Sequence, residues 1–120
     1  MEDQMVITPI KAIVPALFIY VTDIRNSVEW YCNLLGLPIP EITSDDMHIF
    51  DLNVNHCSNL FLKRRVEVTP SPEPIFSITA PDHAAAFQFL TQFGVEIVHM
   101  DQEVIHFKDL DGNVLMACSI

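Results

Sequence analysis

The sequence is poor in basic residues, and this shortage excludes one class of partner. Six lysine and arginine residues stand against 16 acidic ones, which gives a formal net charge of −10. A nucleic-acid-binding protein neutralises phosphates with a basic face, and the chief basic cluster here is Lys63-Arg64-Arg65. We therefore expect no nucleic-acid partner. The acidic charge would favour a cationic small ligand, although acidity also serves solubility.

Cysteine is scarce, and long apolar runs are missing. Cys32, Cys57 and Cys118 form no Cys-x-x-Cys pair, which suits a reducing compartment. No apolar run approaches the roughly 20 residues of a membrane span. The stretch Met1-Glu2-Asp3-Gln4 is acidic, unlike a signal peptide. We expect a cytoplasmic protein with no membrane partner.

What is present is a folded composition, because half of the 120 residues are hydrophobic and only 18% are charged. Two helices are predicted: one capped by Asp23 or Asn26 and ended by Gly36, the other capped at Asp82 and ended by Gly94. Runs rich in β-branched and aromatic residues predict strands. The predicted strands are Pro15–Val21, Ile39–Thr43, Met47–Val54, Asn59–Arg65, Ile75–Thr79, Val95–Met100, Val104–Lys108 and Val114–Ile120.

This order is an internal repeat. Residues 13–65 and 75–120 each read as β-α-β-β-β, and the linker 66–74 contains three prolines. We therefore predict a single α+β domain over residues 1–120. Its two tandem βαβββ modules would form a mixed sheet curved into a cup, with the helices on the outer faces.

The chain resembles the vicinal oxygen chelate superfamily, which includes glyoxalase I, extradiol dioxygenases, fosfomycin-resistance enzymes and bleomycin-binding proteins. The resemblance covers residues 15–120. It is carried by Val21-Thr22-Asp23, Trp30-Tyr31, Leu34-Leu35-Gly36 and a closing Phe107–Asn113 stretch close to the family's F-x-D-P-D-G-N. The resemblance implies paired sheets, either within one chain or between two copies, and we predict a homodimer.

The resemblance also implies where a metal would bind. Members that hold a divalent metal take ligands from strands 1, 4, 5 and 8, and the corresponding residues here are Ala16, Phe61, Ile75 and Met116. None of these side chains can hold a hard or borderline cation. We therefore expect no metal and no other cofactor.

Strand alternation assigns side chains to the face of the sheet away from the helices. The hairpin loop Gln102-Glu103 sets His99 opposite His106 on this face. The predicted lining is mostly apolar with a few directional polar groups, which is typical of small-molecule sites. The predicted ligand-binding residues are Phe18, Tyr20, Asp51, Asn59, Phe61, His99, His106 and Met116.

These residues favour a metal-free protein that binds a small amphipathic, aromatic or cationic organic molecule. One alternative is a metal-independent isomerase or lyase with His106 as the catalytic acid/base. Another is a metal-dependent glyoxalase or dioxygenase-type enzyme with a non-standard site, for example His99, His106 and Asp51. A last alternative is a structural dimer whose cup is filled by its own side chains.

Overall fold

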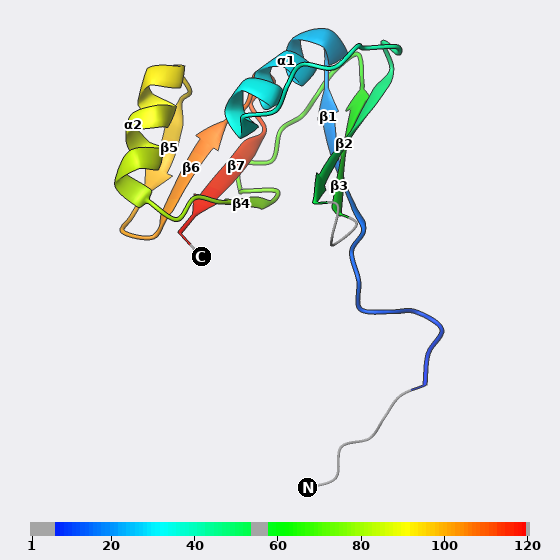
Figure 1. The fold of residues 1–120 in the computed structure, drawn as a ribbon, viewed down its shortest axis with the longest axis horizontal. Helices are drawn as coiled ribbons and strands as arrows, with labels where there is room; N and C mark the ends of the chain where they lie inside the picture. The colour runs from blue at the N-terminus through cyan, green and yellow to red at the C-terminus, as the bar shows by residue number, and fades with distance from the viewer. Residues whose placement is uncertain (1–6, 54–57, 120) are drawn as a thin grey trace, which may run out of the picture.

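The first module forms a three-stranded sheet, which we call sheet A (Figure 1). The computed structural model describes residues 7–53 and 58–119. Within them, sheet A has the order β1-β3-β2, with β1 at Ala16–Val21, β2 at Met47–Asn53 and β3 at Ser58–Arg64. Strand β1 runs parallel to β3, and β2 runs antiparallel to it.

The second module forms a four-stranded sheet, sheet B, in the order β4-β7-β6-β5. Its strands are β4 (Ser77–Thr79), β5 (Ile97–Met100), β6 (Val104–Lys108) and β7 (Val114–Cys118). Here too the first strand of the module pairs in parallel with the last, and the others pair antiparallel. The shared pairing scheme supports the repeat seen in the sequence, and the α+β class is confirmed.

One helix belongs to each module: α1 (Ile24–Leu35) and α2 (His83–Phe93). The carboxylate of Asp23 accepts a hydrogen bond from the backbone N–H of Asn26 and caps α1, and Asp82 caps α2 in the same way. Gly36 and Gly94 end the helices at φ of 70° and 85°. Neither helix is long and apolar enough to cross a membrane.

The predicted strand at Ile39–Thr43 is wrong. Residues 37–46 contain no strand, and the segment begins with Pro38 and Pro40, whose nitrogens carry no hydrogen for a sheet ladder. The other predicted strands occur within two residues of their expected bounds. The predicted strand end at Val54 and the thiol of Cys57 lie outside the described residues, as does Ile120.

A single hydrophobic core joins the two modules. The helix-facing residues of both sheets contribute to it, together with apolar residues of α1 and α2. Helix α1 lies between the sheets, and its Trp30 ring lies 5.5 Å from the Phe93 ring of α2. The fully buried members include Ile19, Val21, Val28, Tyr31, Leu60, Leu62, Ile105, Phe107 and Leu115.

The turn between β6 and β7 ties the modules together through Asp109. Its carboxylate accepts hydrogen bonds from the Tyr31 hydroxyl at 2.7 Å, from the backbone N–H groups of Asp111 and Asn113, and from the Asn113 amide. The Asn113 amide also donates to the carbonyl of Tyr20 at 3.0 Å. The Asp-Leu-Asp-Gly-Asn stretch therefore links the two modules as well as forming the turn.

Candidate functional site

The face of sheet A away from the helices carries an aromatic pair. Phe18 on β1 and Phe61 on β3 are register partners, with ring centroids 5.0 Å apart. Ile49 on β2 continues this row opposite Phe61. Phe18 is 54% exposed and Ile49 is 45% exposed. The row is an apolar platform open to solvent.

Polar groups flank this platform on both sides. Asn59 and Asp51 are cross-strand partners in one neighbouring row, and the Asn59 amide donates to the carbonyl of Pro15 at 3.4 Å. On the other side, the guanidinium of Arg65 lies 3.9 Å from the centroid of the Tyr20 ring. No local pattern links Arg65 to Tyr20 in the sequence, and this cation–π contact was missed there.

Sheet B carries the two predicted histidines. His99 and His106 are register partners with ring centroids 4.9 Å apart, so the predicted register is confirmed. Met116 and Ser77 extend the same row across β7 and β4. His99 Nε2 also lies 3.7 Å from a carboxylate oxygen of Asp101.

The Asp101 carboxylate holds the β5–β6 turn. It accepts hydrogen bonds from the backbone N–H groups of Glu103 and Val104, and these bonds lower the pKa of Asp101, with a smaller contribution from His99. Asp101 therefore keeps a negative charge beside His99, and a cation at this end of the row would meet it.

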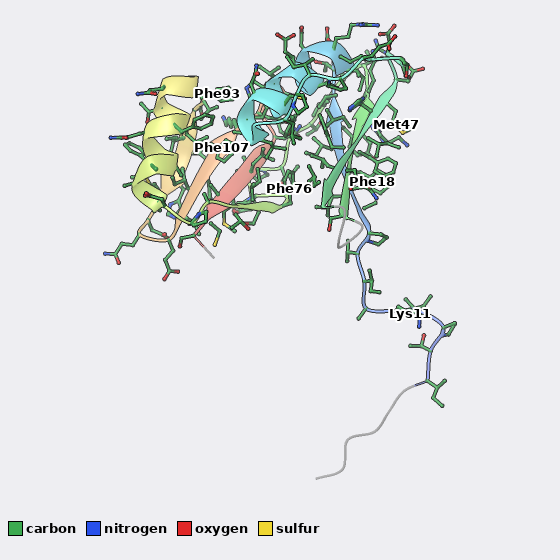
Figure 2. All side chains as sticks on the ribbon, in the orientation of Figure 1. Lys11, Phe18, Met47, Phe76, Phe93 and Phe107 are labelled. Carbon is green, nitrogen blue, oxygen red and sulfur yellow. The ribbon has the colours of Figure 1, made fainter. Side chains whose placement is uncertain are left out.

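The predicted site residues fall into two groups on different sheets. Phe18, Phe61 and their neighbours lie on sheet A, whereas His99, His106 and Met116 lie on sheet B. Because the opposite faces of both sheets share one core, these two faces point away from each other. In Figure 2, Phe76 lies between the sheets and Phe18 on the side of sheet A away from it. Within one chain the two groups do not line a common cup.

The residues at the family's metal positions do not fit a metal. The side chains of Ala16, Phe61 and Ile75 offer no donor atom. Met116 offers only a soft thioether. Within residues 7–53 and 58–119, no three His, Cys, Asp or Glu side chains are grouped so that they could hold an ion. Asp51 in particular lies on the other sheet from His99 and His106.

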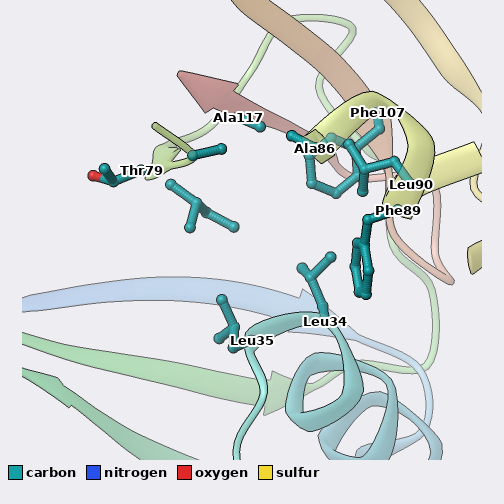
Figure 3. Close-up of a pocket in the computed structure, with 10 residues that line it drawn as sticks. Leu34, Leu35, Thr79, Ala86, Phe89, Leu90, Phe107 and Ala117 are labelled. Atoms are coloured by element: carbon teal, nitrogen blue, oxygen red, sulfur yellow. The ribbon is translucent and has the colours of Figure 1, made fainter. Parts of the chain in front are cut away.

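Cavities occur on the helix-facing side, where the sequence suggested none. A small one of about 100 Å³ lies between the end of α1 and the α2 side of sheet B, lined by Leu34, Phe89 and Phe107 among others (Figure 3). A larger one of about 450 Å³ lies between sheet A and β4. Leu35, Ile78 and Thr79 border both. We call the larger one the inter-sheet cavity.

The chain is built from two related modules, βαββ in the first half and βαβββ in the second. This architecture defines the class of protein, and comparison with known proteins identifies the family. The sequence pattern of the Glyoxalase/Bleomycin resistance protein/Dioxygenase superfamily matches residues 12–117. The chain belongs to this superfamily. A comparison with curated protein sequences finds no match.

Solved structures share the fold at low sequence identity. An NMR structure of a protein from Agrobacterium tumefaciens is 19% identical, covers 88% of this chain and 95% of its own, and has a TM-score of 0.70. A possible glyoxalase from Bacillus cereus is 13% identical, with 90% and 99% covered and a TM-score of 0.68. A mutant fosfomycin resistance protein, FosX, from Listeria monocytogenes, complexed with Mn(II) and 1S,2S-dihydroxypropylphosphonic acid, is 11% identical, with 92% and 91% covered and a TM-score of 0.71.

Proposed function

We propose that this protein binds a small organic molecule, amphipathic, aromatic or cationic, without the help of a metal. The observation that carries the proposal is the exposed aromatic platform of Phe18 and Phe61, flanked by Asn59 and Asp51. Apolar surfaces with a few directional polar groups are the usual lining of small-molecule sites. An aromatic ring would stack on the platform, and a cationic group would meet Asp51.

A second copy of the chain would complete the site. One chain presents the aromatic face and the histidine face on different sides, so a ligand held on Phe18 and Phe61 cannot also contact its own His106. In a two-fold dimer, sheet A of one copy can oppose sheet B of the other, and the same contact recurs twice. The cup would then be lined by all eight predicted residues, within a homodimer of the cytoplasm.

A thermal-shift screen tests the proposal. The panel contains cationic glycopeptides, aromatic amines and aromatic carboxylates, with the wild-type protein and the Phe61→Ala variant in parallel. We expect at least one compound to raise the melting temperature of the wild type and to lose most of that effect in the variant. Leu110→Ala is the matched control, because Leu110 is also apolar and is 58% exposed, but lies in the β6–β7 turn. Stabilisation that is equal in all three proteins would contradict the platform as the site.

The second candidate function is metal-independent isomerase or lyase chemistry with His106 as the acid/base. The specific observation in its favour is the pair of imidazoles, whose ring centroids lie 4.9 Å apart, because an imidazole can donate or accept a proton and the neighbouring ring would hold it in position. The test is turnover of any compound found in the screen by wild type and by His106→Ala. His48→Ala is the control, since it removes a histidine from the helix-facing side of sheet A. Turnover that survives His106→Ala would exclude this role.

The third candidate, a metalloenzyme with a non-standard site, requires Asp51 to meet His99 and His106. These residues lie on different sheets, so the set could assemble only between two copies. Elemental analysis of protein purified without a histidine tag decides the matter. Stoichiometric metal would favour this candidate, and a metal content well below one ion per chain would exclude it.

A further inference from the structure

An apolar arm precedes the first strand. Residues 7–14 form no helix or strand and extend away from the rest of the molecule (Figure 1), and Lys11 marks the middle of this arm in Figure 2. Ile7 is 96% exposed, Ile10 77%, Ile13 64% and Val14 72%. Four large aliphatic side chains in eight residues are an unusual load to leave in water, since single exposed apolar residues are normal but contiguous ones mark contact surfaces.

The local geometry directs this arm away from its own body. The carbonyl of Pro15 accepts a hydrogen bond of 2.9 Å from the N–H of Asn59, so the β1–β3 pairing continues to Pro15, the residue directly after the arm. Val14 precedes a proline, which disfavours the helical conformation that a tight reversal would use. The arm therefore continues in the direction of β1. None of its side chains belongs to the hydrophobic core of the same chain.

The same chain has an apolar space without an occupant among its described residues. The inter-sheet cavity, about 450 Å³, is lined by five leucines, with Phe76 and Ile78 on the β4 side. The hydroxyl-bearing residues Tyr31, Ser58, Ser77 and Thr79 complete the lining. Leu17 and Leu52 face this side yet are 39% and 40% exposed. The 37–46 segment does not join sheet A as a strand, and among the residues that the structure describes this part of the helix-facing side is bordered by the end of α1, Leu37 and the β4 region.

We propose that residues 7–14 of one copy pack into the inter-sheet cavity of a second copy. An extended eight-residue segment spans about 26 Å, enough to reach across a neighbouring module. Within residues 7–53 and 58–119, strand β4 pairs only with β7, and it forms one wall of the cavity, so its outer edge can accept an extended backbone from a second copy. Since every copy carries both the arm and the cavity, a two-fold exchange satisfies both at once. The inference shares with the proposed function only the presence of a second copy.

Sedimentation velocity over a range of protein concentrations tests the exchange in the full-length chain, at a salt concentration that screens the acidic charge. The double variant Ile10→Asp with Ile13→Asp should dissociate at least tenfold more readily than wild type. The matched control, Thr8→Asp with Ala12→Asp, adds the same two carboxylates to the arm but keeps its isoleucines, and should dimerise like wild type. Equal dimerisation of all three proteins, or equal weakening by both variants, overturns the proposal.

A peptide experiment identifies the receiving surface. A fluorescent peptide of residues 1–14 is added to the full-length Ile10→Asp, Ile13→Asp variant, whose own arms are disabled, and anisotropy is followed. We expect binding, and we expect Leu52→Trp in the same background to weaken it at least tenfold by filling the cavity mouth. Val66→Trp is the control, because Val66 is 81% exposed and does not line the cavity. No binding of the peptide, or equal binding to both tryptophan variants, overturns the proposal.

Small-molecule occupancy of the cavity is tested with the neutral probe 1-N-phenylnaphthylamine. The arm variant should bind the probe more strongly than wild type, in which the partner's arm excludes it. Equal binding to both overturns the arm as occupant. The proposed function stands or falls separately, because its readout is stabilisation by ligands that depend on Phe61. If wild type dimerises and binds ligand, and the Ile10→Asp, Ile13→Asp variant dimerises as well as the Thr8→Asp, Ala12→Asp control, the arm exchange is overturned and the proposed function is not.

Discussion

The hydroxyl of Tyr31 donates a 2.7 Å hydrogen bond to the carboxylate of Asp109, which lies 78 positions later in the chain. Tyr31 is on the helix of the first module, and Asp109 opens the turn of the last hairpin of the second. Both side chains are buried. Burial raises the pKa of Tyr31 far above its ordinary value, and the negative charge of Asp109 raises it further. Burial also raises the pKa of Asp109, against the opposing effect of the hydrogen bonds that it accepts.

Removing this hydroxyl should destabilise the protein. Tyr31→Phe keeps the ring in the core but leaves the Asp109 carboxylate one donor short, and we expect a loss of about 1–3 kcal/mol in the free energy of unfolding. Chemical denaturation measures it. The control is Tyr20→Phe, since Tyr20 is the only other tyrosine and is 38% exposed. Its loss should stay within about 0.5 kcal/mol, and equal losses would show that the buried bond contributes nothing.

The raised pKa of Tyr31 predicts a loss of stability in alkali. A group whose folded-state pKa exceeds its unfolded value stabilises the protein fully below the unfolded pKa, about 10 for tyrosine, and loses that contribution as the pH rises above it. The free energy of unfolding should therefore fall above pH ~10. Cys32, whose pKa burial also raises, contributes in the same direction from a lower pH.

Two variants isolate the tyrosine contribution. In Tyr20→Phe, Tyr31 is the only remaining tyrosine, and its phenolate absorbance should appear together with the loss of tertiary structure and not before. In Tyr31→Phe the decline of stability above pH ~10 should be shallower than in wild type. Phenolate formation in the intact fold would contradict the burial of this hydroxyl.

Gly112 provides a test of the backbone conformation of the β6–β7 turn. Gly112 has a φ of +87°, and a Cβ added there would lie 3.4 Å from Cγ of Pro70 in the linker. Gly112→Ala should cost about 1–2 kcal/mol from the left-handed backbone conformation alone. Leu110→Ala in the same turn should be nearly neutral, because Leu110 is exposed. A neutral Gly112→Ala would mean that the turn can change conformation without disturbing Asp109.

Local patterns were sufficient to predict which residues face the core. The two-residue loop at Gln102-Glu103 determines the pairing of His99 with His106, and strand alternation then places Ile105 and Phe107 in the core. The strand prediction at residues 39–43 was wrong because its β-rich composition is outweighed by proline, whose nitrogen has no hydrogen to donate to a sheet.

The relation between the two sheets could not be predicted, because it depends on contacts between distant parts of the chain. The hydrogen bond from Tyr31 to Asp109 produces no sequence pattern in α1 or in the β6–β7 turn from which it could be predicted. The same holds for the shared core, in which Leu60 of one sheet and Phe107 of the other belong to one cluster. The eight predicted site residues were therefore assigned to correct faces, while the separation of those faces onto two sides of the chain appears only in the structure.

The row on sheet B should become a metal site through one substitution. Met116→Glu places a carboxylate opposite His106, whose ring is already 4.9 Å from that of His99. Cross-strand neighbours have Cβ atoms about 4.5–5.5 Å apart, so two imidazoles and one carboxylate can converge, and this is the donor set of many catalytic zinc sites. We expect Met116→Glu to bind one equivalent of Zn²⁺ by isothermal titration, and wild type to bind at least tenfold more weakly.

Two further variants separate this row from unspecific acidity. Met100→Glu adds the same charge to sheet B, at a residue that is 44% exposed and pairs with the core residue Ile105 on the opposite face. It should gain no zinc affinity, and His106→Ala should abolish the gain in Met116→Glu. Zinc binding that is equal in wild type would show that the row already has enough donors, and no gain in Met116→Glu would show that the three side chains do not converge.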